Sequence, residues 1–160
     1  MKSTAYIFFV FALLGQSCSN SDDATVVCVP ETVAQQDPVI DDYIAENNMP
    51  MQVTATGLRY SIDQPGTGDN IVYGDVIEVQ FQGAFLNGSI FDQGVLGPVV
   101  LSQGSFIPGF EEGLLLLNEG AQATLILAAP LAYGCFPPQG TAIGDNEILV
   151  FEITILSVNP

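Results

Sequence analysis

The residues best suited to chemistry lie in three short stretches: Phe91-Asp92, the run from Phe106 to Glu112, and Ala132-Tyr133-Gly134. The sequence holds no histidine, which removes the commonest general base and the commonest metal ligand. The run 106–112 brings several large apolar groups to the beginning of a short predicted helix. Its pair Glu111-Glu112 favours the N-terminus of that helix and is not interpreted as a pair of catalytic carboxylates.

The charge balance excludes one large class of partners. The 160 residues include eighteen Asp and Glu but only two basic residues, Lys2 and Arg59. Because phosphates require cationic neutralisation, nucleic acid is not expected to bind. The acidic pairs Asp69-Asn70 and Asp145-Asn146 are predicted to be turns and not calcium ligands, since neither belongs to a ligand-dense loop. The sequence predicts no metal site.

The N-terminal residues are typical of a targeting segment. Lys2 precedes an apolar run from Ala5 to Leu14, which suits a signal peptide over residues 1–17 and is too short to span a membrane. Gly15 and Ser17 fit ordinary signal peptidase, whereas Cys18 is similar to the lipidated first residue of a bacterial lipoprotein. Lipidation of Cys18 would leave an even pair, Cys28 and Cys135, that an oxidising compartment could bridge. The lipoprotein interpretation is favoured, and both readings remain open.

The elements that must position the chemistry follow from periodicity. Residues 18–36 are predicted to be an acidic tether, and 37–53 a short helix and linker, with Asp37 as cap, Pro38 in its first position and Asn47-Asn48 as its end. In the main domain, residues 54–160, strands are predicted at 56–63, 75–86, 121–130 and 147–158, and short extended pieces at 89–92 and 98–104. Asn87-Gly88 predicts a hairpin, and 111–117 is the one helix. This pattern indicates an α+β domain.

Several motifs together resemble the FKBP-type peptidyl-prolyl cis-trans isomerases over about residues 54–158. They are VQFQGAFLNGSIFD (79–92), GSFIPGFEEGLLLLNEGAQATLILAAPLAYG (104–134) and LVFEITILSV (149–158). The resemblance implies an antiparallel half-barrel sheet wrapped around one short helix. It also implies catalysis of rotation about X-Pro bonds, a reaction that breaks no covalent bond and needs no nucleophile, metal or cofactor.

The resemblance also implies roles for individual residues. Phe110 would be the floor of a pocket beneath the proline ring, the Tyr133 hydroxyl and the Ile107 backbone N–H would bind substrate carbonyls, and Asp92 would orient polar groups around the reacting amide. Ile143 would supply an apolar contact from the loop after Tyr133. The remaining apolar walls would be Phe81, Phe91, Val99, Phe106, Ile107 and Phe151.

Two hypotheses follow for function. The first is a peptidyl-prolyl isomerase that acts on proline-containing exported proteins in a bacterial cell envelope. A lipid on Cys18 would hold it to the outer membrane; whether it faces the periplasm or the cell surface is left open. The alternative is an FKBP-like binding or chaperone module with weak turnover. Phe81 and Phe110 favour the alternative, because they stand where the family usually has tyrosine and tryptophan and so lack a hydroxyl and an indole N–H.

Overall fold

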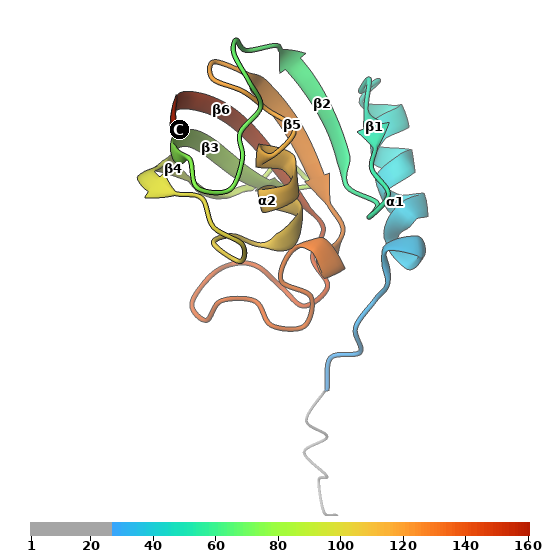
Figure 1. The fold of residues 1–160 in the computed structure, drawn as a ribbon. Helices are drawn as coiled ribbons and strands as arrows, with labels where there is room; N and C mark the ends of the chain where they lie inside the picture. Colours follow the sequence, from blue (N-terminus) through green and yellow to red (C-terminus); the bar gives the residue numbers. More distant parts are fainter. Residues whose placement is uncertain (1–26) are drawn as a thin grey trace, which may run out of the picture.

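The computed structural model describes residues 27–160. The predicted signal peptide, the lipidation site Cys18 and the first part of the tether lie outside these residues. Within them a six-stranded antiparallel sheet has the strand order β1-β2-β5-β6-β3-β4 and curves around one short helix (Figure 1). The strands are β1 (Gln52–Val53), β2 (Arg59–Gln64), β3 (Val76–Phe85), β4 (Ile90–Val100), β5 (Gln122–Leu127) and β6 (Leu149–Asn159). The predicted α+β half-barrel is confirmed.

The two faces of the sheet carry different helices. Along β5, Leu125 and Leu127 belong to the main core with α2 (Pro108–Leu114), whereas Ile126 between them packs in a second cluster with Ile40 of α1 (Val33–Glu46). Because successive strand residues point to opposite faces, α1 and α2 lie on opposite sides of the sheet. The short 3₁₀ turn η1 (Ala129–Leu131) follows β5.

Helix α2 lies unusually close to β5. A Cβ atom on Gly109 would come within 2.7 Å of the Leu127 side chain, and one on Gly113 would overlap Leu125. Both glycines are therefore required by packing, since any larger side chain would push the helix off the sheet.

The boundaries of α2 differ from the predicted 111–117. The helix begins at Pro108, with Ile107 as N-cap, and ends at Leu114. Proline suits the first helical position because its missing N–H would be unpaired there anyway. After Leu114, Leu116 and Leu117 donate to carbonyls three residues back, so the last leucines form tighter turns that lie outside the α-helix.

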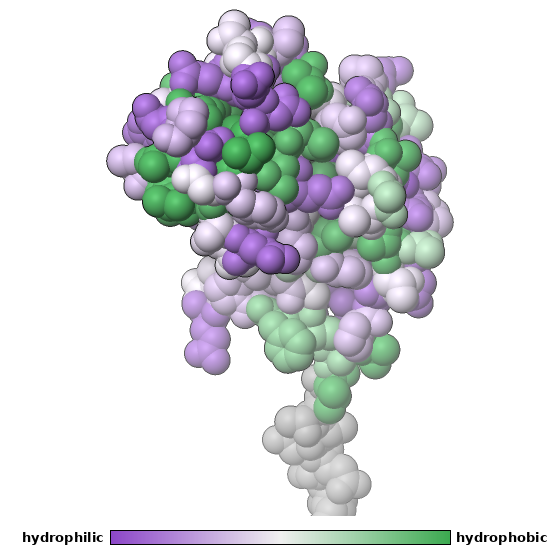
Figure 2. Space-filling model, in the orientation of Figure 1, coloured by the Kyte–Doolittle hydropathy of each residue, from purple (hydrophilic) through white to green (hydrophobic). Residues whose placement is uncertain are grey.

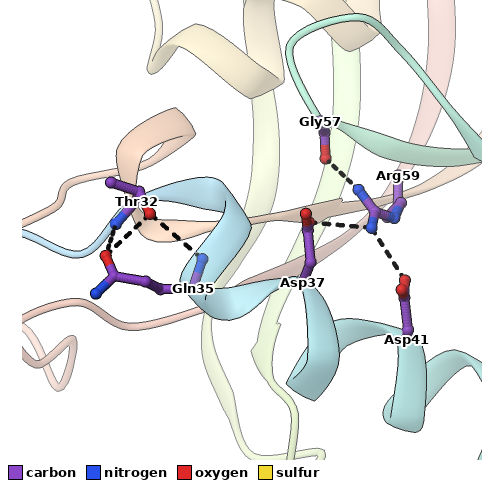
Figure 3. A network of polar contacts seen from close by, with 6 residues as sticks. All are labelled: Thr32, Gln35, Asp37, Asp41, Gly57 and Arg59. Carbon is purple, nitrogen blue, oxygen red and sulfur yellow. Dashed lines mark hydrogen bonds and ion pairs between the residues drawn. The ribbon is translucent and has the colours of Figure 1, made fainter.

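The predicted start of α1 at Asp37 and Pro38 is wrong. Thr32 is the N-cap, and it forms a capping box with Gln35 (Figure 3). Residues 33–36, predicted as tether, are helical, and Pro38 lies inside the helix. The reason is tertiary: the buried Gln36 donates to the Asn146 carbonyl at 2.8 Å and accepts from the Ala129 N–H at 2.7 Å. The predicted end at Asn47 is confirmed.

Arg59 joins α1 to the sheet. Its guanidinium Nη2 lies 3.0 Å from an oxygen of Asp37 and 3.0 Å from one of Asp41, and Nη1 donates to the Gly57 carbonyl at 2.9 Å (Figure 3). Arg59 is the only Lys or Arg within residues 27–160. The positive charge of Arg59 is therefore paired with the carboxylates of α1, at the contact between α1 and β2.

The hairpin predicted at Asn87-Gly88 is confirmed between β3 and β4, with Gly88 at a φ of 82°. The extended pieces predicted separately at 89–92 and 98–104 differ from the structure, where β4 is one strand that ends at Val100. Its pairing with β3 shifts register twice, between Ile77 and Val79 and between Gly83 and Ala84. These irregularities decide which β4 side chains face the core.

Candidate functional site

A cavity of about 560 Å³ opens between the sheet, the N-terminus of α2 and the segment after η1. Most of its wall is aromatic or aliphatic, and few polar groups reach it. Eight residues that the resemblance assigned to the site line it together: Phe81, Phe91, Asp92, Phe106, Ile107, Phe110, Tyr133 and Phe151. The structure thus brings together side chains from β3, β4, β6, α2 and two loops.

Phe110 lies at the centre of the aromatic wall. Its side chain is 3% exposed, and its ring centroid lies 5.2 Å from that of Phe151, 5.5 Å from Phe106 and 6.4 Å from Phe81. Such tilted and edge-to-face arrangements are the preferred geometry of aromatic pairs. Phe110 is therefore held from three sides, which gives the cavity a rigid floor.

Gly83 explains how Phe91 reaches the same wall. A Cβ on Gly83 would lie 2.5 Å from the Phe91 ring and 3.0 Å from the Phe151 ring. Gly83 pairs in register with Asp92 of β4 and with Phe151 of β6. The missing side chain lets both rings approach the strand, and their centroids are 5.7 Å apart.

Three polar groups are available at the cavity. The Ile107 N–H makes no hydrogen bond within residues 27–160, although the Ile107 carbonyl accepts from Phe110 and Glu111. The Tyr133 hydroxyl likewise has no partner in the described part of the chain. Burial, and then the negative charge of Asp92, raise the pKa of Tyr133 above its usual 10.0. The hydroxyl therefore keeps its proton and can donate to an incoming acceptor.

Asp92 is exposed at the rim, and one of its oxygens accepts from the Gln93 N–H at 2.8 Å. No side chain within residues 27–160 donates to it, and Phe81 has no hydroxyl that could do so. Asp92 therefore presents, beside the apolar cavity, a carboxylate whose partner within residues 27–160 is the Gln93 backbone N–H.

Two predicted wall residues do not line the cavity. Val99 and Ile143 pack against the main core instead. Leu96, Ser105 and Pro108 line it in their place. The register shift opposite Ile77 and Val79 adds one residue to β4, so that Leu96 lies opposite Val79 and Val99 opposite Ile77. Both β4 side chains therefore pack against the core, and of the two only Leu96 lines the cavity. Strict alternation from Asp92 would have selected Leu96.

A larger hollow of about 720 Å³ crosses the outer face of the sheet. It is lined mainly by polar side chains, among them Gln80, Gln82, Gln93 and Gln122. The aromatic cavity is the better candidate site, because apolar walls with a few convergent polar groups are typical of ligand pockets.

The segment after Tyr133 is tied to the N-terminal extension. Cys28 and Cys135 are disulfide-bonded, with their Cα atoms 5.6 Å apart. Asn146, at a φ of 55°, donates from its side chain to the Val29 carbonyl and accepts from the Glu31 N–H, and its own N–H binds the Gly134 carbonyl at 2.8 Å. These contacts fix the backbone directly after the pocket residue Tyr133.

Within residues 27–160, no three His, Cys, Asp or Glu side chains lie together in a way that could hold a metal ion. Over the same residues, no helix has the length and apolar character needed to cross a membrane.

Comparison with known proteins places this site in a family. The model of the FKBP-type peptidyl-prolyl cis-trans isomerases matches residues 68–156. A Neisseria meningitidis protein named "Probable FKBP-type peptidyl-prolyl cis-trans isomerase FkpA" is 34% identical over 110 residues, 68% of this chain and 40% of its own length. A Legionella longbeachae protein named "Outer membrane protein MIP" is also 34% identical over 110 residues, 66% of this chain and 46% of its own.

The fold agrees with these matches. The crystal structure of FkpA from Escherichia coli superposes with a TM-score of 0.65 at 26% identity, over 80% of this chain and 61% of that one. The chain matches less than half the length of the two bacterial relatives above. Because the matched region contains the whole aromatic cavity, the chain belongs to the FKBP-type peptidyl-prolyl cis-trans isomerase family.

Proposed function

We propose that this chain accelerates cis-trans rotation about X-Pro bonds of polypeptides. The observation that carries the proposal is the aromatic cavity, in which the Ile107 N–H, unbonded within residues 27–160, and the Tyr133 hydroxyl adjoin the Phe110 floor. An apolar cavity of this size accommodates a proline ring and its neighbouring side chain.

The physical demand of the reaction is modest. Rotation about the amide faces a barrier of about 20 kcal/mol because resonance makes the C–N bond partly double. Acceleration by a hundred to ten thousand requires lowering it by only about 3–5 kcal/mol. A site that binds the twisted amide more tightly than the planar one supplies this without a covalent step.

Each residue has a distinct task in this proposal. The Ile107 N–H and the Tyr133 hydroxyl hold substrate carbonyls, and the Phe110 floor with its aromatic neighbours removes water from the amide. The twisted amide has less charge separation than the planar one, so an apolar surrounding favours it. Asp92 lies beside the reacting bond and orients polar groups.

The proposed setting is the cell envelope, with clients among exported proteins and a lipid anchor on Cys18. Support comes from the apolar run before Cys18, from a disulfide that suits an oxidising compartment, and from the relative named as an outer membrane protein. Palmitate labelling tests the anchor: wild type should take up label and Cys18→Ser should not. Labelling of both would refute the assignment.

A second candidate is a proline-binding module with little turnover. It is favoured by one observation: within the described residues the Asp92 carboxylate accepts only from the Gln93 backbone N–H, so no side chain helps to hold the group that should orient the amide.

Exchange spectroscopy on a Leu-Pro peptide separates the two candidates. With residues 19–160, we expect acceleration that falls in Asp92→Ala and in Tyr133→Phe. Peptide binding without acceleration by the folded protein would support the binding module and reject the isomerase.

A further inference from the structure

Glu111 is a buried carboxylate that the proposed reaction does not use. It lies in the first turn of α2 and is 7% exposed. Arg59, the only Lys or Arg within residues 27–160, is bound to Asp37 and Asp41, so no cation there compensates the Glu111 charge. A buried charge without a counter-ion is costly unless several donors surround it.

Three donors surround Glu111. The Gly104 N–H lies 2.9 Å from Oε2 and 3.2 Å from Oε1, the Phe106 N–H lies 3.4 Å from Oε2, and the Tyr73 hydroxyl donates to Oε1 at 2.8 Å. Two of these donors belong to the loop between β4 and α2. This is the loop that places Ser105, Phe106 and Ile107 on the cavity wall.

The arrangement determines which backbone amide stays free. Glu111 occupies the N–H groups of Gly104 and Phe106, and the Ser105 N–H binds the Ser102 carbonyl at 3.0 Å. The next N–H, that of Ile107, has no partner in the described part of the chain. A loop without the carboxylate would retain only its Ser102–Ser105 contacts and would leave the Gly104 and Phe106 amides open to other partners.

Tyr73 holds the carboxylate in place from outside. Its ring is 48% exposed, next to Val72 at 57% exposed, and Figure 2 shows hydrophobic and hydrophilic residues interspersed on this face of the molecule. The hydrogen bond to Glu111, followed by burial and the Glu111 charge, raises the pKa of Tyr73 above 10.0. The Tyr73 hydroxyl therefore stays protonated and donates at neutral pH. Through Glu111 it links the turn before β3 to the loop between β4 and α2.

We propose that Glu111 is a positioning residue: its buried carboxylate fixes the loop 104–106 so that the Ile107 amide alone is presented to the substrate carbonyl. The effect on turnover rests on the proposed isomerase function. Glu111 itself does not line the cavity, so its influence passes through the loop backbone.

The test compares three variants within one helical turn. Glu111→Ala removes every acceptor, whereas Glu111→Gln keeps an amide oxygen for Gly104 and Phe106 and an NH₂ for the Tyr73 oxygen. Glu112→Ala is the matched control, because the Glu112 carboxylate binds Thr56 at 2.6 Å and makes no contact with the loop. Exchange kinetics with a Leu-Pro peptide give KM and kcat for each.

We expect Glu111→Ala to raise KM roughly tenfold with kcat changed less than about twofold, the size of one lost charge-assisted hydrogen bond. The KM of Glu111→Gln should stay within about threefold of the wild-type KM, and the KM of Glu112→Ala should equal the wild-type value. A wild-type KM in Glu111→Ala would overturn the proposal. So would equal impairment in Glu111→Gln, since burial or charge and not hydrogen-bond acceptance would then be responsible.

Amide hydrogen exchange in the wild-type protein decides the same point without any variant or turnover. The Gly104 amide should exchange at least about tenfold more slowly than the Ile107 amide. Equal rates would overturn the inference even if Glu111→Ala failed to fold. Absence of isomerase activity in the wild type would reject the proposed function, and the exchange result would still decide the role of Glu111 in the loop.

Discussion

Replacing Phe110 by leucine should separate the role of this ring in stability from its role in the cavity. The side chain is 3% exposed and makes three ring–ring contacts, with Phe81, Phe106 and Phe151. Each aromatic pair contributes about 0.5–1.5 kcal/mol beyond buried area. Because leucine keeps part of the volume, we take the lower end for each and expect a loss of about 1.5 kcal/mol in the free energy of unfolding.

The loss of the cavity floor should also lower kcat/KM about tenfold, because one lost apolar contact of about 1.4 kcal/mol in the transition state corresponds to that factor. Urea unfolding followed by circular dichroism gives the first quantity. Proline exchange spectroscopy on a Leu-Pro peptide gives the second. A total stability of about 5–15 kcal/mol leaves the variant folded for both assays.

Phe85→Leu is the matched control. Phe85 is partly buried and makes one ring contact, 5.1 Å from Phe91, but it does not line the cavity. It should lose about 0.5–1 kcal/mol of stability and keep wild-type kcat/KM. The reasoning would be refuted if folded Phe110→Leu kept full activity, or if Phe85→Leu lost activity to the same degree.

Three further predictions concern the parts that hold the site. Cys28 and Cys135 are 107 residues apart, and reduction of their disulfide should lower the unfolding free energy by about 3–5 kcal/mol, because the closed loop no longer limits the unfolded chain. A loss of less than about 1 kcal/mol, measured by urea unfolding, would contradict this. Arg59→Met should cost about 1–2 kcal/mol, and Asp41→Asn only a few tenths, because the Asp41 side chain is 62% exposed; equal losses in thermal unfolding would contradict the assignment. The Tyr133 pKa is raised, so its hydroxyl stays protonated and can donate below that pKa, and it loses its proton as the pH rises through it. The part of the activity that Tyr133→Phe removes should therefore persist up to pH 10.0 in a pH–rate profile. Loss of that activity below pH 9 would contradict a role as neutral donor.

The predictions from sequence succeeded where local pattern and local packing agree. The alternation of 76–81 and the Asn87-Gly88 turn specify the β3–β4 hairpin through contacts between near neighbours. The start of α1 was missed because a proline pattern competed with the capping box at Thr32, and the buried Gln36 decides between them through Asn146, 110 residues away. Val99 was assigned to the cavity wall by resemblance alone; in the structure it lies opposite Ile77 and packs against the main core, and Leu96 lines the wall.

The sequence by itself determined the family through its motifs, and the resemblance carried by those motifs implied the half-barrel and most of the aromatic wall, because the wall residues lie within or next to the motifs. Only the tertiary structure decided how the polar groups around that wall are used. Glu111 accepts from the Gly104 and Phe106 amides and is held by Tyr73, 38 residues before it, whereas the Ile107 amide has no partner within residues 27–160. Such hydrogen bonds depend on distances between segments that are remote in the chain, and local sequence pattern carries no information about them.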